Sequence, residues 1–211
     1  MAAVQIDLDV PTPLPEIPVP AQRTALLLVD LQNESCHPDG KNYHPECVSA
    51  VTATAALVER ARHYRCPVLW LRSVRRADQP VFTVYGVVPY RLEGSWNVEI
   101  TPPLKPAPDE PVFLKYSHDC FYDTGLDEYL AGQGIVAPDW TFVVAGVALA
   151  GCVYVAATGL SHRGYRTVIP MDCVAPRTGP RALMTMDRLA HRSYSYNTHL
   201  LASSAGLNFV A

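Results

Sequence analysis

The chain has 211 residues, of which 49% are hydrophobic and 18% are charged. These values are typical of a globular protein with one sizeable core, and they leave too little chain for two comfortable domains. The formal charge of −3 provides no basic surface of the kind that binds nucleic acid or anionic membranes. We therefore expect a small molecule as the ligand, and neither nucleic acid nor a membrane as a partner.

The first residues differ in composition from the rest of the chain. The stretch "PTPLPEIPVP" carries five prolines, which lack backbone donors and resist helix formation. The sequence predicts an extended arm over residues 1–22 and a single domain over residues 23–211. The start has neither the basic nor the apolar region of a signal peptide, and no apolar run approaches the length of a membrane span. We expect a cytoplasmic protein whose six scattered cysteines are reduced thiols.

Apolar runs alternate with amphipathic ones along the chain. Strands are predicted at residues 24–32, 68–74, 111–116, 141–146 and 166–172, with an edge strand at 207–211. Helices are predicted at residues 48–65, 125–134, 151–163 and 179–192. Residues 75–110 form a long irregular segment, which is typical of a lid or another functional loop. This order predicts a three-layer α/β/α sandwich, Rossmann-like, around a mostly parallel sheet of about six strands.

Three reactive side chains follow strands of the predicted sheet. Asp30 ends the first strand, Lys115 ends the third, and Cys152 follows the fourth. Ligands of such sheets bind beyond the carboxyl ends of the strands, so these side chains are expected to converge there. The start of a helix stabilises a thiolate, which predicts a reactive Cys152 with a lowered pKa. The alternatives are a buried thiol and two solvated boundary charges.

Four stretches, in this order, resemble the isochorismatase-like cysteine hydrolase superfamily over about residues 22–200. They are "ALLLVDLQNE", "EGSWNVEI", "VFLKYSHDCFYDTGLDEYL" and "VAGVALAGCVYVAATGLSHRGYRTVIPMDCVA". The resemblance implies that Cys152 is the nucleophile, Asp30 the general base and Lys115 the third catalytic residue. It also implies a cis peptide bond between Val147 and Ala148, and an oxyanion hole formed by the backbone N–H groups of Ala148 and Cys152.

The resemblance further predicts the reaction. A thiol that a carboxylate deprotonates attacks a carbonyl carbon, so we expect hydrolysis of a small amide, carbamoyl or ureido C–N bond through a Cys152 thioester. Isochorismatases carry Gly at the position of Cys152. Many amidases of the family carry two threonines where this chain has Ala148 and Leu149. Two alternatives stay open: an ether hydrolase of the isochorismatase type, and a catalytically silent member that acts as a binding protein.

No metal or other cofactor is expected. Nicotinamidase-like members carry an Asp-x-His motif and a further His, whereas "LWLRSVRRADQP" contains no His. Cys36, His37, His44 and Cys47 are residue types that bind Zn²⁺, but their spacing is not that of a zinc finger. We interpret this stretch as a loop whose histidines border the pocket.

Several other residues are candidates for contacts to the substrate. Gln32 and Asn33 directly follow the base, and Trp96 and Tyr122 are aromatic residues that a core or a subunit contact would also explain. His118 and His162 are expected at the pocket rim and on the surface. The arginines of the irregular segment are candidates to bind a carboxylate, with solvation as the alternative: Arg75, Arg76 and Arg91. We also expect a homo-oligomer, either a dimer or a tetramer.

Overall fold

The structure is a computed structural model that describes residues 13–191 and 199–210. Its centre is a sheet in the order β4-β3-β2-β5-β6-β8, with β7 paired to β5. The strands are β2 (Thr24–Val29), β3 (Val68–Ser73), β4 (Val112–Lys115), β5 (Thr141–Val147), β6 (Arg166–Pro170), β7 (Val174–Ala175) and β8 (His199–Ala202). All pairs among these strands are parallel. The predicted mostly parallel α/β sheet is confirmed.

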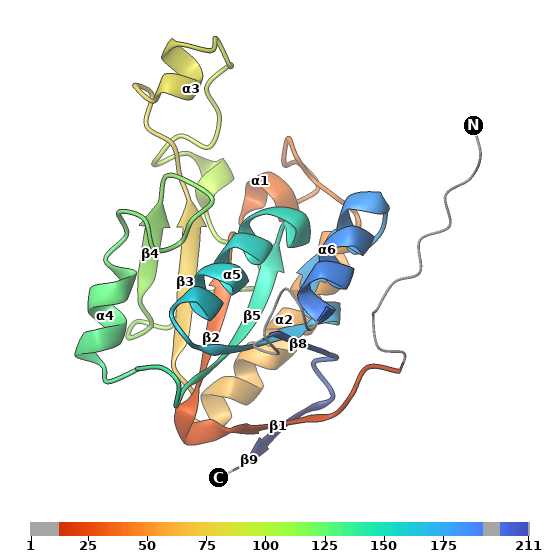
Figure 1. Ribbon diagram of the computed structural model, residues 1–211. Helices are drawn as coiled ribbons and strands as arrows, with labels where there is room; N and C mark the ends of the chain where they lie inside the picture. The colour runs from red at the N-terminus through yellow and green to blue at the C-terminus, as the bar shows by residue number, and fades with distance from the viewer. Residues whose placement is uncertain (1–12, 192–198, 211) are drawn as a thin grey trace.

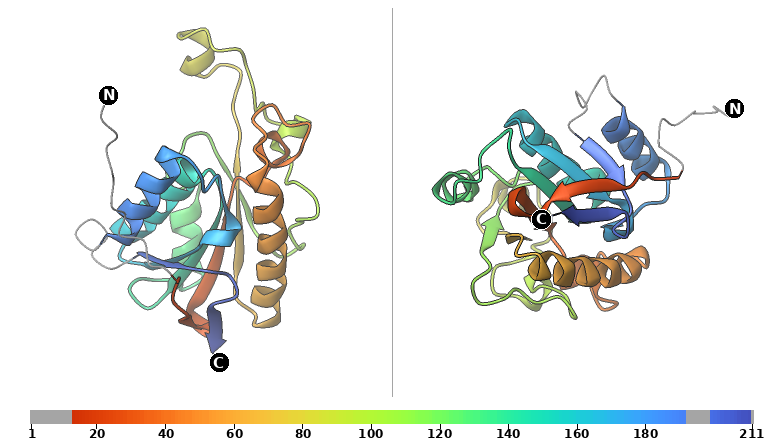
Figure 2. Two further views of the ribbon diagram at one scale, coloured as in Figure 1. Left: turned by 90° about the vertical axis from the view of Figure 1, so that its right-hand side faces the viewer. Right: turned by 90° about the horizontal axis from the view of Figure 1, so that it is seen from below.

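Helices cover both faces of the sheet (Figures 1 and 2). Helix α2 (Glu46–His63) lies on one face, and α4 (Leu126–Gly132), α5 (Tyr154–His162) and α6 (Pro180–Ala190) lie on the other. The side chains of β2 alternate between these layers: Leu26 and Leu28 pack in the core under α2, while Leu27 packs in the opposite core. A strand buried on both faces must be apolar throughout, which is why residues 24–29 carry no charge.

Glycine allows the two central strands to approach closely. Gly146 is the register partner of Val29 and has a φ of 134°. A Cβ atom at this position would lie 2.0 Å from the carbonyl oxygen of Val29. Any other residue would therefore push β5 away from β2, just before the chain enters the turn that carries Cys152.

The edges of the molecule differ from the sequence predictions. Residues 207–211 were expected as an edge strand of the central sheet, but β9 (Leu207–Val210) pairs with β1 (Ile17–Pro20) in a separate two-stranded sheet. The true edge strand is β8, which the sequence analysis missed. Residues 1–12 of the predicted arm lie outside the described residues. Its last residues belong to the fold, because β1 pairs with β9 and its Ile17 and Val19 are buried.

The irregular segment between β3 and β4 contains little regular structure. It holds α3 (Pro80–Thr83) and a 3₁₀ turn at Trp96–Val98. In Figure 1, α3 projects beyond the carboxyl ends of the strands, on the side of the sheet where β3 and β4 lie. Three of its neighbours, Val84, Tyr85 and Val88, expose at least 70% of their surface. The short helix α1 (Asn33–Cys36) follows β2 at the same end of the sheet.

Candidate active site

Asp30, Lys115 and Cys152 meet at the carboxyl ends of the strands. Asp30 directly follows β2, Lys115 is the last residue of β4, and Cys152 follows β5 in the turn Leu149–Val153. The Lys115 ammonium lies 2.8 Å from Oδ2 of Asp30 and donates a hydrogen bond of 3.3 Å to Sγ of Cys152. The ammonium also donates a hydrogen bond to the carbonyl oxygen of Ser117, which fixes it between the other two groups.

All three side chains are withdrawn from solvent. Lys115 is 0% exposed, Asp30 3% and Cys152 8%, so the charges interact in a medium of low dielectric constant. Asp30 has a φ of 52°, a left-handed conformation that Asp adopts more readily than most residues. Neither carboxylate oxygen of Asp30 accepts an aligned hydrogen bond from the described residues. The carboxylate thus retains free lone pairs that can take a proton.

The pKa of Cys152 corrects the sequence analysis. Burial, followed by the nearby Asp30 carboxylate, raises the pKa of this thiol to about 11, although Lys115 opposes the change. The predicted helix start is present, because Gly151 is not helical, with φ −135° and ψ −111°, and the helical backbone continues from Cys152 into α5. The predicted lowering of the pKa is nevertheless not found, because burial and Asp30 act in the opposite direction. Burial lowers the pKa of Lys115, but Asp30 and Cys152 outweigh it, so that pKa is raised. Before the reaction, Cys152 is therefore a protonated thiol that lies beside the Lys115–Asp30 ion pair.

The nucleophile turn has an unusual backbone. The peptide bond between Val147 and Ala148 is cis, the geometry that the sequence resemblance implied. The carbonyl oxygen of Ala148 accepts hydrogen bonds from the N–H groups of Gly151 and Val153. A cavity of about 520 Å³ lies beside the turn and is lined by Ala148, Ala150, Gly151, Pro176, Thr178, Gly179, Pro180, Arg181 and Ala182. Small side chains of the turn thus line this cavity, whereas Cys152 is not among its lining residues.

Gln32 and Asn33 lie close to the base, but their bonding differs. The Gln32 side chain donates to the carbonyl oxygens of Ser73 and Val98 and accepts from the Ser73 N–H. Since Ser73 is the register partner of Lys115, Gln32 fixes the strand beside the lysine. Asn33 donates to the carbonyl oxygen of Trp96, and its own buried oxygen has no hydrogen-bond partner among the described residues. Asn33 thus retains an acceptor for a ligand, whereas the Gln32 amide is fully occupied.

The two aromatic candidates are more exposed than the triad. Trp96 is 42% exposed and packs edge-on against His37, with the ring centroids 5.0 Å apart. Tyr122 is 69% exposed. His118 lies near the nucleophile turn, because a Cβ atom on Gly151 would be 4.0 Å from its Cδ2. The sequence analysis missed the contribution of the Ser117 carbonyl, because a backbone acceptor leaves no signal in residue types.

The Cys36, His37, His44 and Cys47 side chains do not converge on one point. The ring of His37 accepts from the Asp39 N–H and that of His44 from the Glu46 N–H, while Cys36 hydrogen-bonds Cys47. Over residues 13–191 and 199–210, no group of three or more His, Cys, Asp or Glu side chains is arranged to hold a metal ion. Within the same ranges, no helix has the length and apolar character to span a bilayer.

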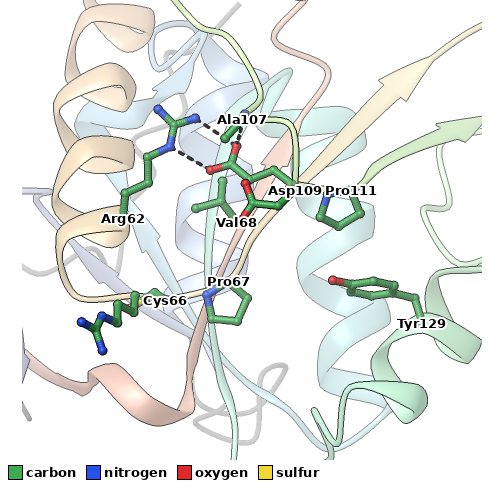
Figure 3. Close-up of a pocket in the computed structure, with 10 residues that line it drawn as sticks. Arg62, Cys66, Pro67, Val68, Ala107, Asp109, Pro111 and Tyr129 are labelled. Carbon is green, nitrogen blue, oxygen red and sulfur yellow. Dashed lines mark hydrogen bonds and ion pairs between the residues drawn. The ribbon is translucent and has the colours of Figure 1, made fainter.

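A second cavity, of about 370 Å³, lies at the opposite, amino ends of β3 and β4 (Figure 3). Its polar wall is the ion pair between Arg62 and Glu110. Glu110 also accepts hydrogen bonds from Trp70 Nε1 and the Ala107 N–H, so its oxygens are satisfied. The Glu110 carboxylate is therefore already paired, although Asp109 also lines the cavity. The candidate active site is the one at the carboxyl ends, where Asp30, Lys115 and Cys152 meet.

Comparisons with known proteins show the family to which the chain belongs. The model of the isochorismatase domain family matches residues 24–197. Maleamate amidohydrolase from Pseudomonas putida is 28% identical over 163 residues, which are 74% of each chain. Ureidoacrylate amidohydrolase from Methylobacterium radiotolerans is 26% identical over 76% of this chain and 69% of its own. The crystal structure of N-carbamoylsarcosine amidase from Thermoplasma acidophilum superposes with a TM-score of 0.71, at 25% identity, over 86% of this chain and 96% of that one.

Proposed function

Because the chain belongs to the isochorismatase family, we propose that it hydrolyses a small amide, carbamoyl or ureido substrate through a thioester on Cys152. The predicted enzyme class, a hydrolase of C–N bonds, is confirmed at the level of its amidohydrolase relatives. The observation that supports the finer proposal is the Lys115 ammonium, which lies 2.8 Å from the Asp30 carboxylate and 3.3 Å from the Cys152 sulfur. This arrangement joins a nucleophile, a base and a fixed positive charge.

In the first half of the proposed reaction, Asp30 takes the proton of the Cys152 thiol as the sulfur attacks the carbonyl carbon. Lys115 stabilises the sulfur while it becomes negative, which offsets the raised pKa of the free thiol. The backbone N–H groups of Ala148 and Cys152 are the proposed donors to the oxyanion. Asp30 then returns its proton to the nitrogen, the C–N bond breaks, and ammonia or an amine leaves the thioester behind.

In the second half, water attacks the thioester carbon. Asp30 is again the base and takes a proton from this water, and the tetrahedral intermediate expels the Cys152 sulfur. Asp30 passes this proton to the Cys152 sulfur, and the substrate acyl group leaves as a carboxylic or carbamic acid. Each turnover consumes one water molecule and leaves Asp30, Lys115 and Cys152 in their starting states. The burial of all three groups shields the thioester from other nucleophiles.

The test measures ammonia or amine release over a panel of small amides and ureides, with Cys152→Ala and Cys66→Ala compared with the wild type. Cys66 is a matched control, since burial also raises its pKa to about 11 and it lies before β3, at the far end of the sheet. We expect Cys152→Ala to lose turnover and the acyl adduct that mass spectrometry detects after acid quenching, and Cys66→Ala to keep both.

Three outcomes would contradict the proposal. Substantial turnover by Cys152→Ala would eliminate the covalent route. Activity on isochorismate alone would favour the ether hydrolase, and a silent panel would favour the binding protein. The homo-oligomeric state, the cytoplasmic location and the substrate contacts of Gln32, Asn33, Trp96 and Tyr122 stay predictions.

A further inference from the structure

Two arginines stand at the base of the projecting segment, beside the candidate active site. The Arg75 N–H donates to the carbonyl oxygen of Arg91 at 2.8 Å, so their backbones are joined. Arg75 Nη1 donates to the carbonyl oxygen of Tyr116, the residue after Lys115. Arg91 Nη2 donates to Oγ of Ser35 on α1, which follows the Asp30 strand. The pair therefore connects the β4 end of the site with its α1 side.

The positive charges of Arg75 and Arg91 have no counterion within the described part of the chain. Among the described residues, neither guanidinium has a carboxylate within ion-pair distance, whereas the neighbouring Arg76 lies 3.9 Å from Asp78. The Nε atom of Arg91 is also buried, and no hydrogen-bond acceptor in the described part of the chain reaches it. A buried N–H group without a partner is costly, so this position favours a ligand that supplies an acceptor.

His118 connects the arginines to the reaction centre. It lies beside Gly151 in the nucleophile turn. Burial lowers the pKa of His118, and the positive charges of Lys115, Arg75 and Arg91 lower it further. Asp30 acts in the opposite direction but is outweighed. His118, beside the nucleophile turn, thus lies within electrostatic reach of both arginines.

We propose that Arg91, supported by Arg75, binds a carboxylate of the substrate, so that the enzyme acts on small amides or ureides that also carry a carboxylate group. This inference rests on the proposed function for the reacting end of the substrate. A guanidinium suits this task because its planar N–H groups match the two oxygens of a carboxylate. The unpartnered Arg91 Nε supplies one of these donors.

The first test uses Cys152 as a reporter and needs no turnover. Alkylation rates with iodoacetate and iodoacetamide are each divided by the rate with N-acetylcysteine, which removes the intrinsic difference between the reagents. We expect the ratio of the normalised rates, iodoacetate over iodoacetamide, to be about ten or more in the wild type. Arg91→Gln should reduce this ratio about tenfold, and the ratio cancels any change in thiol reactivity that both reagents share.

Two further variants exclude trivial explanations. Arg76→Gln removes an exposed, already paired arginine of the same segment, and it should keep the wild-type ratio. Arg91→Lys preserves the charge but not the planar donors, so it should give a ratio between those of the wild type and Arg91→Gln. This variant also tests Arg91 if Arg91→Gln does not fold. A wild-type ratio of one or below, or an equal loss in Arg76→Gln, would overturn the proposal.

The second test compares substrates that differ in charge, such as succinamate and succinamide. We expect a tenfold or higher kcat/KM for the carboxylate, lost in Arg91→Gln mainly through KM. Equal kcat/KM values for the two compounds would contradict carboxylate recognition while leaving amide hydrolysis intact. Alkylation that prefers iodoacetate without hydrolysis of any amide would instead support the carboxylate site and contradict the proposed function.

Discussion

The two ends of the sheet each hold a carboxylate beside a cation, Asp30 buried and Glu110 partly buried, and the two pairs are built differently. At the amino end, Glu110 accepts hydrogen bonds from Arg62, from Trp70 and from a backbone N–H. At the carboxyl end, Asp30 faces Lys115 at 2.8 Å, but its oxygens have no aligned hydrogen bond within the described chain. One carboxylate is saturated with donors and the other is not.

This difference indicates which pair can react. Burial raises the pKa of Glu110, but the hydrogen bonds from Arg62 and its other donors outweigh it and hold that pKa below the usual value. Such a carboxylate does not readily accept a proton. Asp30, in contrast, lies in contact with a thiol whose pKa is raised to about 11 and which retains its proton. We infer that the amino-end pair stabilises the fold and the carboxyl-end pair is built for proton transfer.

Replacing the cation of the reactive pair should have the largest effect. Lys115→Met removes the positive charge that stabilises the Cys152 thiolate, so we expect the acylation rate to fall at least about a hundredfold. The pKa of Cys152 should rise further, which moves the rate profile to higher pH and allows partial recovery there. Stopped-flow acylation across pH measures both changes.

Lys115→Arg should recover only part of the rate, because a planar guanidinium does not replace a compact ammonium. Acylation by Lys115→Met at the wild-type rate, with an unchanged pH profile, would remove Lys115 from the mechanism. The Lys115–Asp30 pair would then be structural, like the Arg62–Glu110 pair.

The matched change at the amino end should affect stability alone. Arg62→Met leaves the partly buried Glu110 without its cation, and we expect the free energy of unfolding to fall by about 1 to 2 kcal/mol. The rate per folded molecule should stay within about twofold of the wild type, because the pair lies at the other end of the strands. Denaturant unfolding and steady-state assays on the same samples test this. A hundredfold loss of kcat in the folded Arg62→Met protein would show that the two ends are coupled.

The contrast also explains what the sequence could predict. Asp30, Lys115 and Cys152 follow apolar strands, and a parallel sheet brings such strand ends together, so their convergence followed from order alone. The raised pKa of Cys152 did not follow, because it depends on burial and on the nearby Asp30 carboxylate. Sequence patterns locate a residue at a strand end more readily than they give the depth of its burial.

The edges of the fold were harder to predict for a related reason. The four-residue strand β8 is too short to show periodicity, and the pairing of β9 with β1 joins residues about 190 positions apart. The Arg62–Glu110 pair was missed as well, because 48 residues separate its members. Contacts of this kind depend on tertiary packing.

Acid should weaken the amino-end pair in a defined window. Glu110 has a lowered pKa in the folded protein, so its contribution to stability is fully present above its ordinary value of 4.5. That contribution is lost as the pH falls through the lowered pKa, since the folded state must then bind a proton that the unfolded state already holds. The difference in unfolding free energy between the wild type and Glu110→Gln should therefore shrink below about pH 4.5. A difference that stays constant down to pH 2 would contradict this assignment.

The smallest effect is expected from chelators. Their use tests whether the Lys115–Asp30 pair acts without a metal ion. Lys115 places its ammonium 2.8 Å from Asp30 and 3.3 Å from Cys152, so the positive charge that a metal would supply is already provided. Dialysis against EDTA should therefore change ammonia release by less than about twofold, with Lys115→Met as the contrasting case. Activity that falls on chelation and returns with Zn²⁺, together with about one bound metal per chain by elemental analysis, would show that Lys115 does not act alone.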